Sequence, residues 1–135
     1  MIDITTKPIS PEAVVNSVRT PGSGCVAAYV GLIRDNSHGK QVLSVEYSDT
    51  RGTAKAELEK IAGEIRRQWT VEGIAISHRI GRLEVGEINF MVAIAAAHRR
   101  EGYAAAQYAV DHFKEVLPTR KTETYRDGSS YVEGK

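Results

Sequence analysis

The chain has 135 residues, a length typical of one domain, with 41% hydrophobic and 26% charged residues. Its 18 Lys and Arg residues nearly balance 17 Asp and Glu residues, so the formal charge is only +1. This balance excludes a long-range field that attracts nucleic acid or an acidic membrane. No apolar run approaches the ~20 residues of a membrane span, and the N-terminus lacks a signal-peptide pattern. We therefore expect a single cytoplasmic domain over residues 1–135.

The first part of the chain combines one helix signal with two strand signals. Ser10 followed by Pro11 predicts a helix start, with serine as the N-cap and proline at the first helical position. A nearly continuous apolar run at 25–33 predicts a central strand. The polar loop 34–40 then leads to an alternating strand at 42–47. We expect these two strands to pair as a hairpin.

The rest of the chain alternates helices with pairs of strands. Apolar residues at helical spacing predict amphipathic helices over 53–69 and 101–117, and Pro118 ends the second one. The order of elements indicates an α+β fold, a two-layer sandwich of helices on a mainly antiparallel sheet. The remaining strand signals lie at 73–80, at 88–97 and around a terminal hairpin turn at Asp127-Gly128.

Positive side chains gather where the predicted strands and the last helix begin or end. Arg34 ends a strand, and His98 and Arg99 stand between a strand and the last helix. Lys114 borders the apolar stripe that Tyr103 begins in this helix, and Lys121 follows the end of the helix. Each residue alone is most simply a solvated charge, yet together they mark places where proteins hold anions. A lysine beside another cation can also act as a base or nucleophile near neutral pH.

The length of the last helix divides these cations into two groups. A straight helix places His98 and Arg99 about 25 Å from Lys121, at 1.5 Å per residue. We therefore expect the two groups to meet only where two copies of the chain share a site.

Metal and cysteine chemistry find no support in the sequence. Cys25 is the only cysteine, which excludes an intrachain disulfide and a cysteine-based zinc site. Its neighbours are small and apolar, so we expect a buried, inert thiol. The four histidines lack metal-binding spacing, and no nucleotide-binding loop or Ser-His-Asp order is present. The residues alone thus predict a lysine-assisted site for a phosphorylated or carboxylate ligand. They predict no metal site.

Four segments resemble the large, catalytic subunit of molybdopterin synthase, in the order and spacing of that family: GLIRDN (31–36), SHRIGRLEVGE (77–87), AAAHRREGYAA (95–105) and FKEVLPTRKTE (113–123). The resemblance implies an α/β-hammerhead fold and a sulfurtransferase that converts cyclic pyranopterin monophosphate, or precursor Z, into molybdopterin. The sulfur would arrive as a thiocarboxylate on the Gly-Gly C-terminus of a small ubiquitin-like subunit, so no cofactor is expected. Two large subunits would form the central homodimer of a heterotetramer.

The resemblance also implies a role for individual residues. Arg34, His98 and Arg99 match anion-binding positions that would hold the phosphate of the substrate. Lys114 and Lys121 match the two catalytic lysines and would also contact substrate. The other substrate-binding positions are Leu32, Ile33, Thr122 and Glu123, with Glu123 able to orient Lys121, whereas His78, Arg79 and Arg100 receive structural or rim roles.

The chain departs from this family just before the second lysine. Thr119 and Arg120 stand where an apolar residue and a tryptophan are usual. A non-catalytic relative that only binds the small subunit is therefore an alternative. A nucleotide- or RNA-binding module built on His98 and Arg99 is another, although the near-zero charge and the lack of interleaved aromatic residues count against it.

Overall fold

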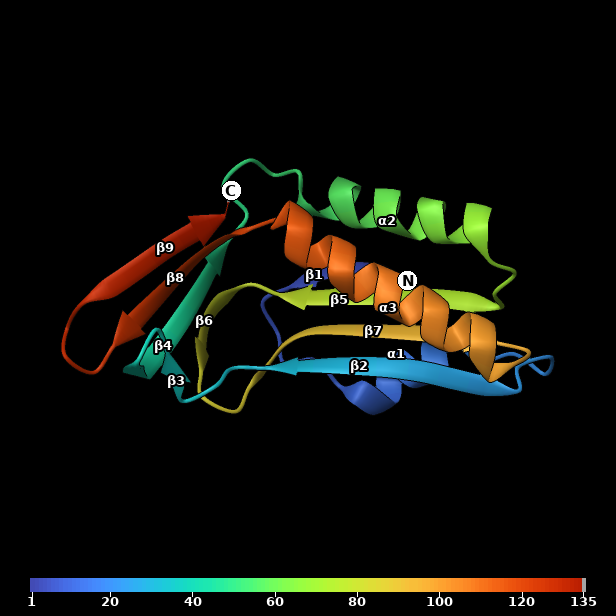
Figure 1. Ribbon diagram of the computed structural model, residues 1–135, viewed down its shortest axis with the longest axis horizontal. Coiled ribbons are helices and arrows are strands. Elements are labelled where there is room, and N and C mark those ends of the chain that lie inside the picture. The colour runs from blue at the N-terminus through green and yellow to red at the C-terminus, as the bar shows by residue number, and fades with distance from the viewer. Residues whose placement is uncertain (135) are drawn as a thin grey trace.

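The helix-covered half of the molecule is built on a four-stranded sheet (Figure 1). In the computed structural model of the protein, residues 1–134 are described. In spatial order the strands are β1 (Ile2–Thr5), β5 (Gly73–Arg79), β7 (Ile88–Ala96) and β2 (Cys25–Leu32). β1 and β5 pair in parallel, and the other two pairs are antiparallel.

A second, antiparallel sheet forms the other half of the molecule, and no helix of residues 1–134 covers its faces (Figure 1). The last two strands form the hairpin that Asp127-Gly128 predicted, and that prediction is confirmed. The sheet encloses a small apolar core around Leu83 and Tyr125. Its path is β3 (Asn36–Ser37), β4 (Lys40–Ser48), β8 (Arg120–Tyr125) and β9 (Ser130–Gly134), with β6 (Gly81–Glu84) paired to β4.

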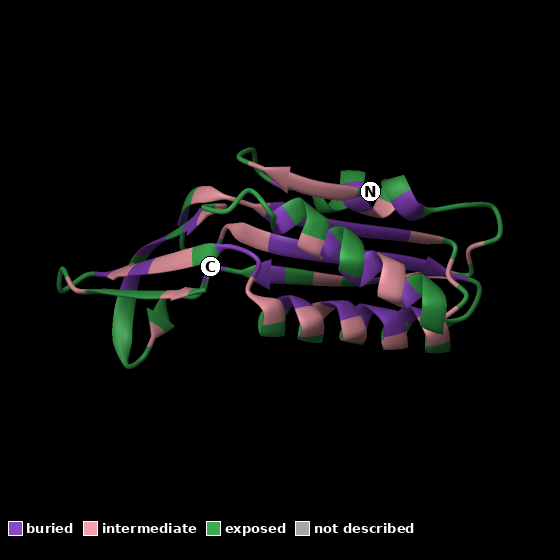
Figure 2. Ribbon diagram, turned by 90° about the horizontal axis from the view of Figure 1, so that it is seen from above, coloured by how far each residue is buried: buried purple, intermediate pink, exposed green. Residues whose placement is uncertain are grey.

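Three helices pack on both faces of the four-stranded sheet: α1 (Pro11–Val18) on one face, and α2 (Ala54–Gln68) and α3 (Arg99–Val116) on the other. Alternate residues of β7 enter the two cores, as the period of a strand requires. Phe90 and Val92 face α2 and α3, whereas Met91 and Ala93 face α1. Buried residues in Figure 2 accordingly line the strands and the inward faces of the helices.

Local signals explain where two of the helices begin or end. The hydroxyl oxygen of Ser10 accepts a hydrogen bond from the Ala13 amide at 3.3 Å, so Ser10 caps α1 as predicted. At the end of α3, Leu117 adopts a left-handed conformation with φ 46°, and Pro118 prevents the helix from continuing. The buried face of α3 is shifted from the predicted stripe, because Tyr103 is 69% exposed, whereas Gly102, Ala105 and Ala109 are buried together with Ala106 and Phe113.

The α+β class with mainly antiparallel pairing is confirmed, and the structure adds a second sheet and a helix on the opposite face of the first. The predicted hairpin of the strands at 25–33 and 42–47 is wrong. The first pairs with β7 and the second with β8 and β6, so the loop between them carries the chain from one sheet to the other. Because β7 is apolar along its length, it takes a central place in the sheet with a strand on each side, and β2 is one of these two strands. Among the described residues, no helix is long and apolar enough to cross a membrane.

Candidate functional site

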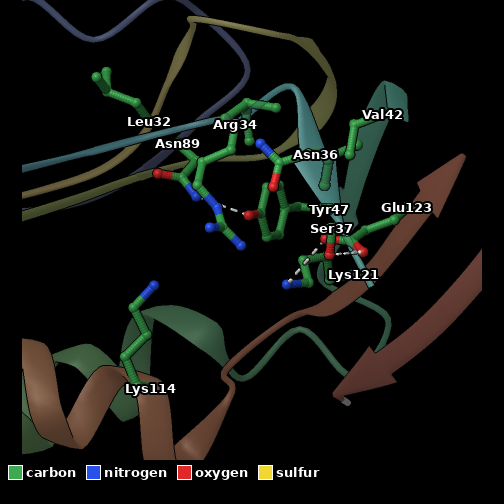
Figure 3. A pocket seen from close by; sticks show the side chains of 12 residues that line it. Leu32, Arg34, Asn36, Ser37, Val42, Tyr47, Asn89, Lys114, Lys121 and Glu123 are labelled. Atoms are coloured by element: carbon green, nitrogen blue, oxygen red, sulfur yellow. Dashed lines mark hydrogen bonds and ion pairs between the residues drawn. The ribbon is translucent and has the colours of Figure 1, made fainter. Parts of the chain in front are cut away.

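A polar cavity of about 200 Å³ opens where the two sheets meet beside the end of α3 (Figure 3). Both sheets and the helix contribute side chains to its wall. A neighbouring cavity of about 240 Å³ shares Tyr47, Asn89, Lys114 and Lys121 with it, so these four residues stand between the two spaces. The first cavity is lined by Leu32, Ile33, Arg34, Asn36, Ser37, Val42, Val45, Tyr47, Asn89, Lys114, Lys121 and Glu123.

The cavity brings together most of the residues predicted to bind substrate. Thr122 lies between two cavity residues on β8, and its side chain takes the opposite face of the strand by alternation. His98 and Arg99 also lie outside the cavity. The predicted residues that line it are Leu32, Ile33, Arg34, Lys114, Lys121 and Glu123.

His98 and Arg99 occupy the far end of α3. His98 is the N-cap residue and Arg99 begins the helix, whose 18 residues span about 27 Å. Arg99 lines a separate cavity of about 50 Å³ with Cys25 and the exposed Tyr103. Cys25 is half-buried rather than fully buried, because its strand lies at the edge of the sheet. The separation expected from the helix rise is thus present, and one chain alone does not join the two groups of cations.

Lys121 is held by two carboxylates. Its Nζ lies 2.7 Å from Oε1 of Glu133, its direct partner on β9, and 3.6 Å from Oε2 of Glu123. Burial by itself lowers the pKa of Lys121, but the hydrogen bond with Glu133 and the nearby negative charges reverse this and raise it above the ordinary value. Lys121 is therefore a firmly protonated ammonium in the ligand-free protein.

Glu123 is itself fixed by neighbouring hydroxyl groups. Ser37 donates to its Oε1 at 2.8 Å, and Tyr125 donates to the same atom at 2.7 Å. Burial raises the pKa of Glu123, but these two hydrogen bonds and the charge of Lys121 outweigh burial and leave the pKa below its usual value. The carboxylate thus stays charged although it is only 7% exposed, and its second oxygen faces the ammonium of Lys121.

Lys114 has the opposite environment. Figure 3 shows it rising from the end of α3 toward Arg34 and Asn89. Within residues 1–134 it has no ion-pair or hydrogen-bond partner. Lys114 is still exposed to solvent, but the partial burial of its side chain and, next, the charge of Lys121 lower its pKa. The cavity therefore presents one cation that is held protonated and one amine that loses its proton more readily.

Sequence reasoning missed Tyr47 and Asn89. Tyr47 is the cross-strand partner of Lys121, and its hydroxyl oxygen accepts a hydrogen bond from Asn89 Nδ2 at 2.8 Å. Burial raises the pKa of Tyr47, so its hydroxyl keeps its proton. Only the pairing of β4 with β8, which is distant along the chain, could have shown that Tyr47 belongs beside Lys121.

Removing the charge of Glu133 should change how Lys121 titrates. We expect Glu133→Gln to lower the pKa of Lys121, because Glu133 supplies the shorter of its two ion pairs. A step that needs the protonated Lys121 is lost as pH rises through this pKa, so the alkaline limb of the activity profile moves to lower pH. The pH dependence of kcat for the native chain and the variant measures this shift. Glu115→Gln, at an exposed position of α3, is the control. An alkaline limb that does not move, or moves to higher pH, contradicts the assignment.

Comparisons with known proteins show which family this chain resembles. A family model described as MoaE protein matches residues 4–116. A molybdopterin synthase catalytic subunit from Nostoc sp. is 40% identical over 94% of this chain and 78% of that protein. The crystal structure of molybdopterin synthase from Staphylococcus aureus matches with a TM-score of 0.92 and 29% identity, over 99% of this chain and 97% of that one.

A more distant structure shares the fold alone. It is a complex of subunits 1 and 2 of the molybdopterin-converting factor from Helicobacter pylori, with a TM-score of 0.76 and 14% identity, over 94% of this chain and 87% of that one. The family match covers most of the chain, and the Nostoc relative aligns with nearly all of it. The chain belongs to the MoaE protein family, whose relatives are named molybdopterin synthase catalytic subunits.

Proposed function

We propose that this chain is the catalytic subunit of a molybdopterin synthase and transfers sulfur in the synthesis of molybdopterin. The observation that carries the proposal is the cavity in which Lys114 and Lys121 stand with opposite environments. Acid–base catalysis commonly uses two titratable groups whose surroundings shift their pKa values in opposite directions. Membership of the MoaE family supports the same activity.

The substrate we propose is cyclic pyranopterin monophosphate. A ring system of this kind needs a polar cavity with hydrogen-bonding side chains, and Asn36, Asn89 and Tyr47 supply them. Arg34 would contact the phosphate from the same chain, since a guanidinium binds phosphate through two parallel hydrogen bonds. His98 and Arg99 would complete the phosphate site from a second copy of the chain.

The sulfur would come from a partner protein. The only thiol of the chain, Cys25, lies outside both cavities that contain the lysines, and its Sγ is 3.8 Å from the Ala96 carbonyl oxygen. An external donor is therefore needed, and the thiocarboxylate on the Gly-Gly C-terminus of a small ubiquitin-like subunit is the donor we propose. A pair of glycines can pass through a narrow opening, because it has no side chains. This route requires no resident cofactor.

The two lysines would divide the chemistry between them. Lys121, kept protonated by Glu133 and Glu123, would stabilise negative charge on the thiocarboxylate and on the carboxylate it becomes. Lys114, which gives up its proton more readily, would act as the base that takes a proton from the water molecule whose oxygen replaces the transferred sulfur on the carrier. Tyr47 and Asn89, fixed by their mutual hydrogen bond, would orient the substrate between the two lysines.

The test is a reconstitution with purified components. The native chain, a thiocarboxylated small subunit and precursor Z should yield molybdopterin, which is measured as its fluorescent oxidation product. The same mixture with an unmodified carboxylate on the small subunit is the control and should yield none. A tight complex with the small subunit but no product would contradict catalysis and favour the binding-only relative, which the departure at Thr119 and Arg120 brought into consideration.

A further inference from the structure

His78 is a fully buried histidine that the proposed chemistry does not use. Its side chain is 0% exposed and lies on β5, in the four-stranded sheet. Its Nδ1 is 2.8 Å from the Asn89 carbonyl oxygen, and its Nε2 is 2.8 Å from the Thr119 hydroxyl oxygen. Two residues of the cavity wall, from β7 and from the segment before β8, thus bind one imidazole ring.

The partners of His78 determine which of its nitrogen atoms carries the proton. A backbone carbonyl only accepts hydrogen bonds, so Nδ1 must be the protonated nitrogen that donates to Asn89. Burial lowers the pKa of His78 and keeps the ring neutral, which leaves a lone pair on Nε2. The hydroxyl of Thr119 is the donor that satisfies this lone pair. Thr119 therefore makes a directed hydrogen bond in the interior, and a valine of the same shape cannot make it.

Thr119 ends a strained connector, residues 117–119, that joins the two lysine-bearing elements. Leu117 has φ 46°, a left-handed conformation that costs free energy for a residue with a side chain. Such a conformation persists only where the surroundings fix it. Pro118 is buried, and the backbone of Gly134 packs so closely on the Thr119 carbonyl oxygen that a Cβ at position 134 would collide with it. On the inner side, the hydrogen bond to His78 holds the connector in place.

The ring of His78 also touches the immediate neighbours of both lysines. Phe113, which precedes Lys114, packs at right angles to it with the ring centres 5.1 Å apart. Tyr47, the cross-strand partner of Lys121, packs edge-on with the ring centres 4.9 Å apart. A shift of the imidazole would therefore displace the neighbours of both lysines.

We propose that His78 and Thr119 are positioning residues, and that their buried hydrogen bond sets the separation of Lys114 and Lys121. The inference rests on the proposed function for its catalytic consequence, and on geometry alone for its effect on the lysines. The hydroxyl of Thr119 is the group that completes the hydrogen bonding of His78.

The test compares Thr119→Val, which keeps the shape and loses the hydroxyl, with Thr119→Ser, which keeps the hydroxyl. We expect kcat of Thr119→Val to fall about 10- to 100-fold, because small misplacements of catalytic groups are costly. KM should change less than kcat, because no side chain that lines the first cavity is replaced. Thr119→Ser should retain most of the native kcat. Ser77→Ala removes a buried hydroxyl from the neighbouring position of β5 and should leave kcat unchanged.

Two NMR measurements make the test independent of the reconstitution. The nitrogen chemical shifts of the native protein should show His78 protonated at Nδ1 and hydrogen-bonded at Nε2, and no variant has to fold for this result. In the ligand-free Thr119→Val protein, the pKa of Lys114 should rise toward the ordinary value of a lysine as the cavity loosens. A proton on Nε2 of native His78, or a Thr119→Val protein with native kcat and native Lys114 pKa, overturns the inference. If the native chain forms no product, the proposed function fails, and the lysine titration still decides the positioning role.

Discussion

Replacing Lys114 with methionine should reduce the rate of sulfur transfer by about 10²- to 10⁴-fold, the contribution that a general base makes to catalysis. The substitution keeps the length and the apolar stem of the side chain and removes only the amine. Lys114 has no partner among the described residues that its loss would leave unpaired, so the variant should fold as the native chain does. Single-turnover rates with a thiocarboxylated small subunit measure the effect.

The control for this prediction is Lys55→Met, at an exposed position of α2 away from the cavity. It removes the same charge from the protein and should retain the native rate. If Lys114→Met also keeps a rate within a few-fold of the native one, Lys114 is not the base. A comparable loss in both variants attributes the effect to net charge rather than to the site.

Two inactive variants should recover activity when they are combined in one hybrid dimer. Arg99→Ala should remove the phosphate contact, and Lys121→Ala should remove the ammonium from the cavity. Because the 18 residues of α3, about 27 Å in length, lie between Arg99 and Lys121, each site would take Arg99 from one chain and Lys121 from the other. A hybrid then contains one intact site and one site with both changes. Doubly tagged hybrids, purified by both tags, should show about half of the native activity, as two-fold symmetry requires.

The matched control combines Lys114→Met with Lys121→Ala. Both lysines line the cavity of the same chain, so every site of this hybrid lacks one of them and no activity should return. Recovery in this control would assign the two lysines to different chains. No recovery in the Arg99→Ala and Lys121→Ala hybrid, although both proteins are folded and dimeric, would contradict a site shared between two chains.

The parts of the fold that depend on local signals could be predicted from the sequence. The helix that carries Lys114 was expected from its periodicity and from Pro118, and its length alone separated His98 and Arg99 from the lysines. The pairing of β2 with β7 could not be predicted in this way, because it joins residues that lie far apart along the chain. Closeness along the chain predicts the strand at 42–47 as the partner instead.

The same limit explains which site residues were missed. Tyr47 and Glu133 meet Lys121 only through the registers of β4 with β8 and of β8 with β9. Register depends on which side chains the finished sheets bury, and a strand pattern alone does not contain that information. The sequence around His78 indicates only a structural or rim role, because its contacts to Asn89 and Thr119 form only when three distant segments come together in the fold.

The central claim is that one cavity raises the pKa of Lys121 while it lowers the pKa of Lys114. An NMR titration of the two side-chain nitrogen atoms in the ligand-free native protein tests this claim most directly. We predict that Lys114 loses its proton at a lower pH than Lys121, with the pKa of Lys114 below and the pKa of Lys121 above the ordinary value of a lysine. Two equal pKa values, or a Lys121 that loses its proton first, would contradict the division of roles between the two lysines.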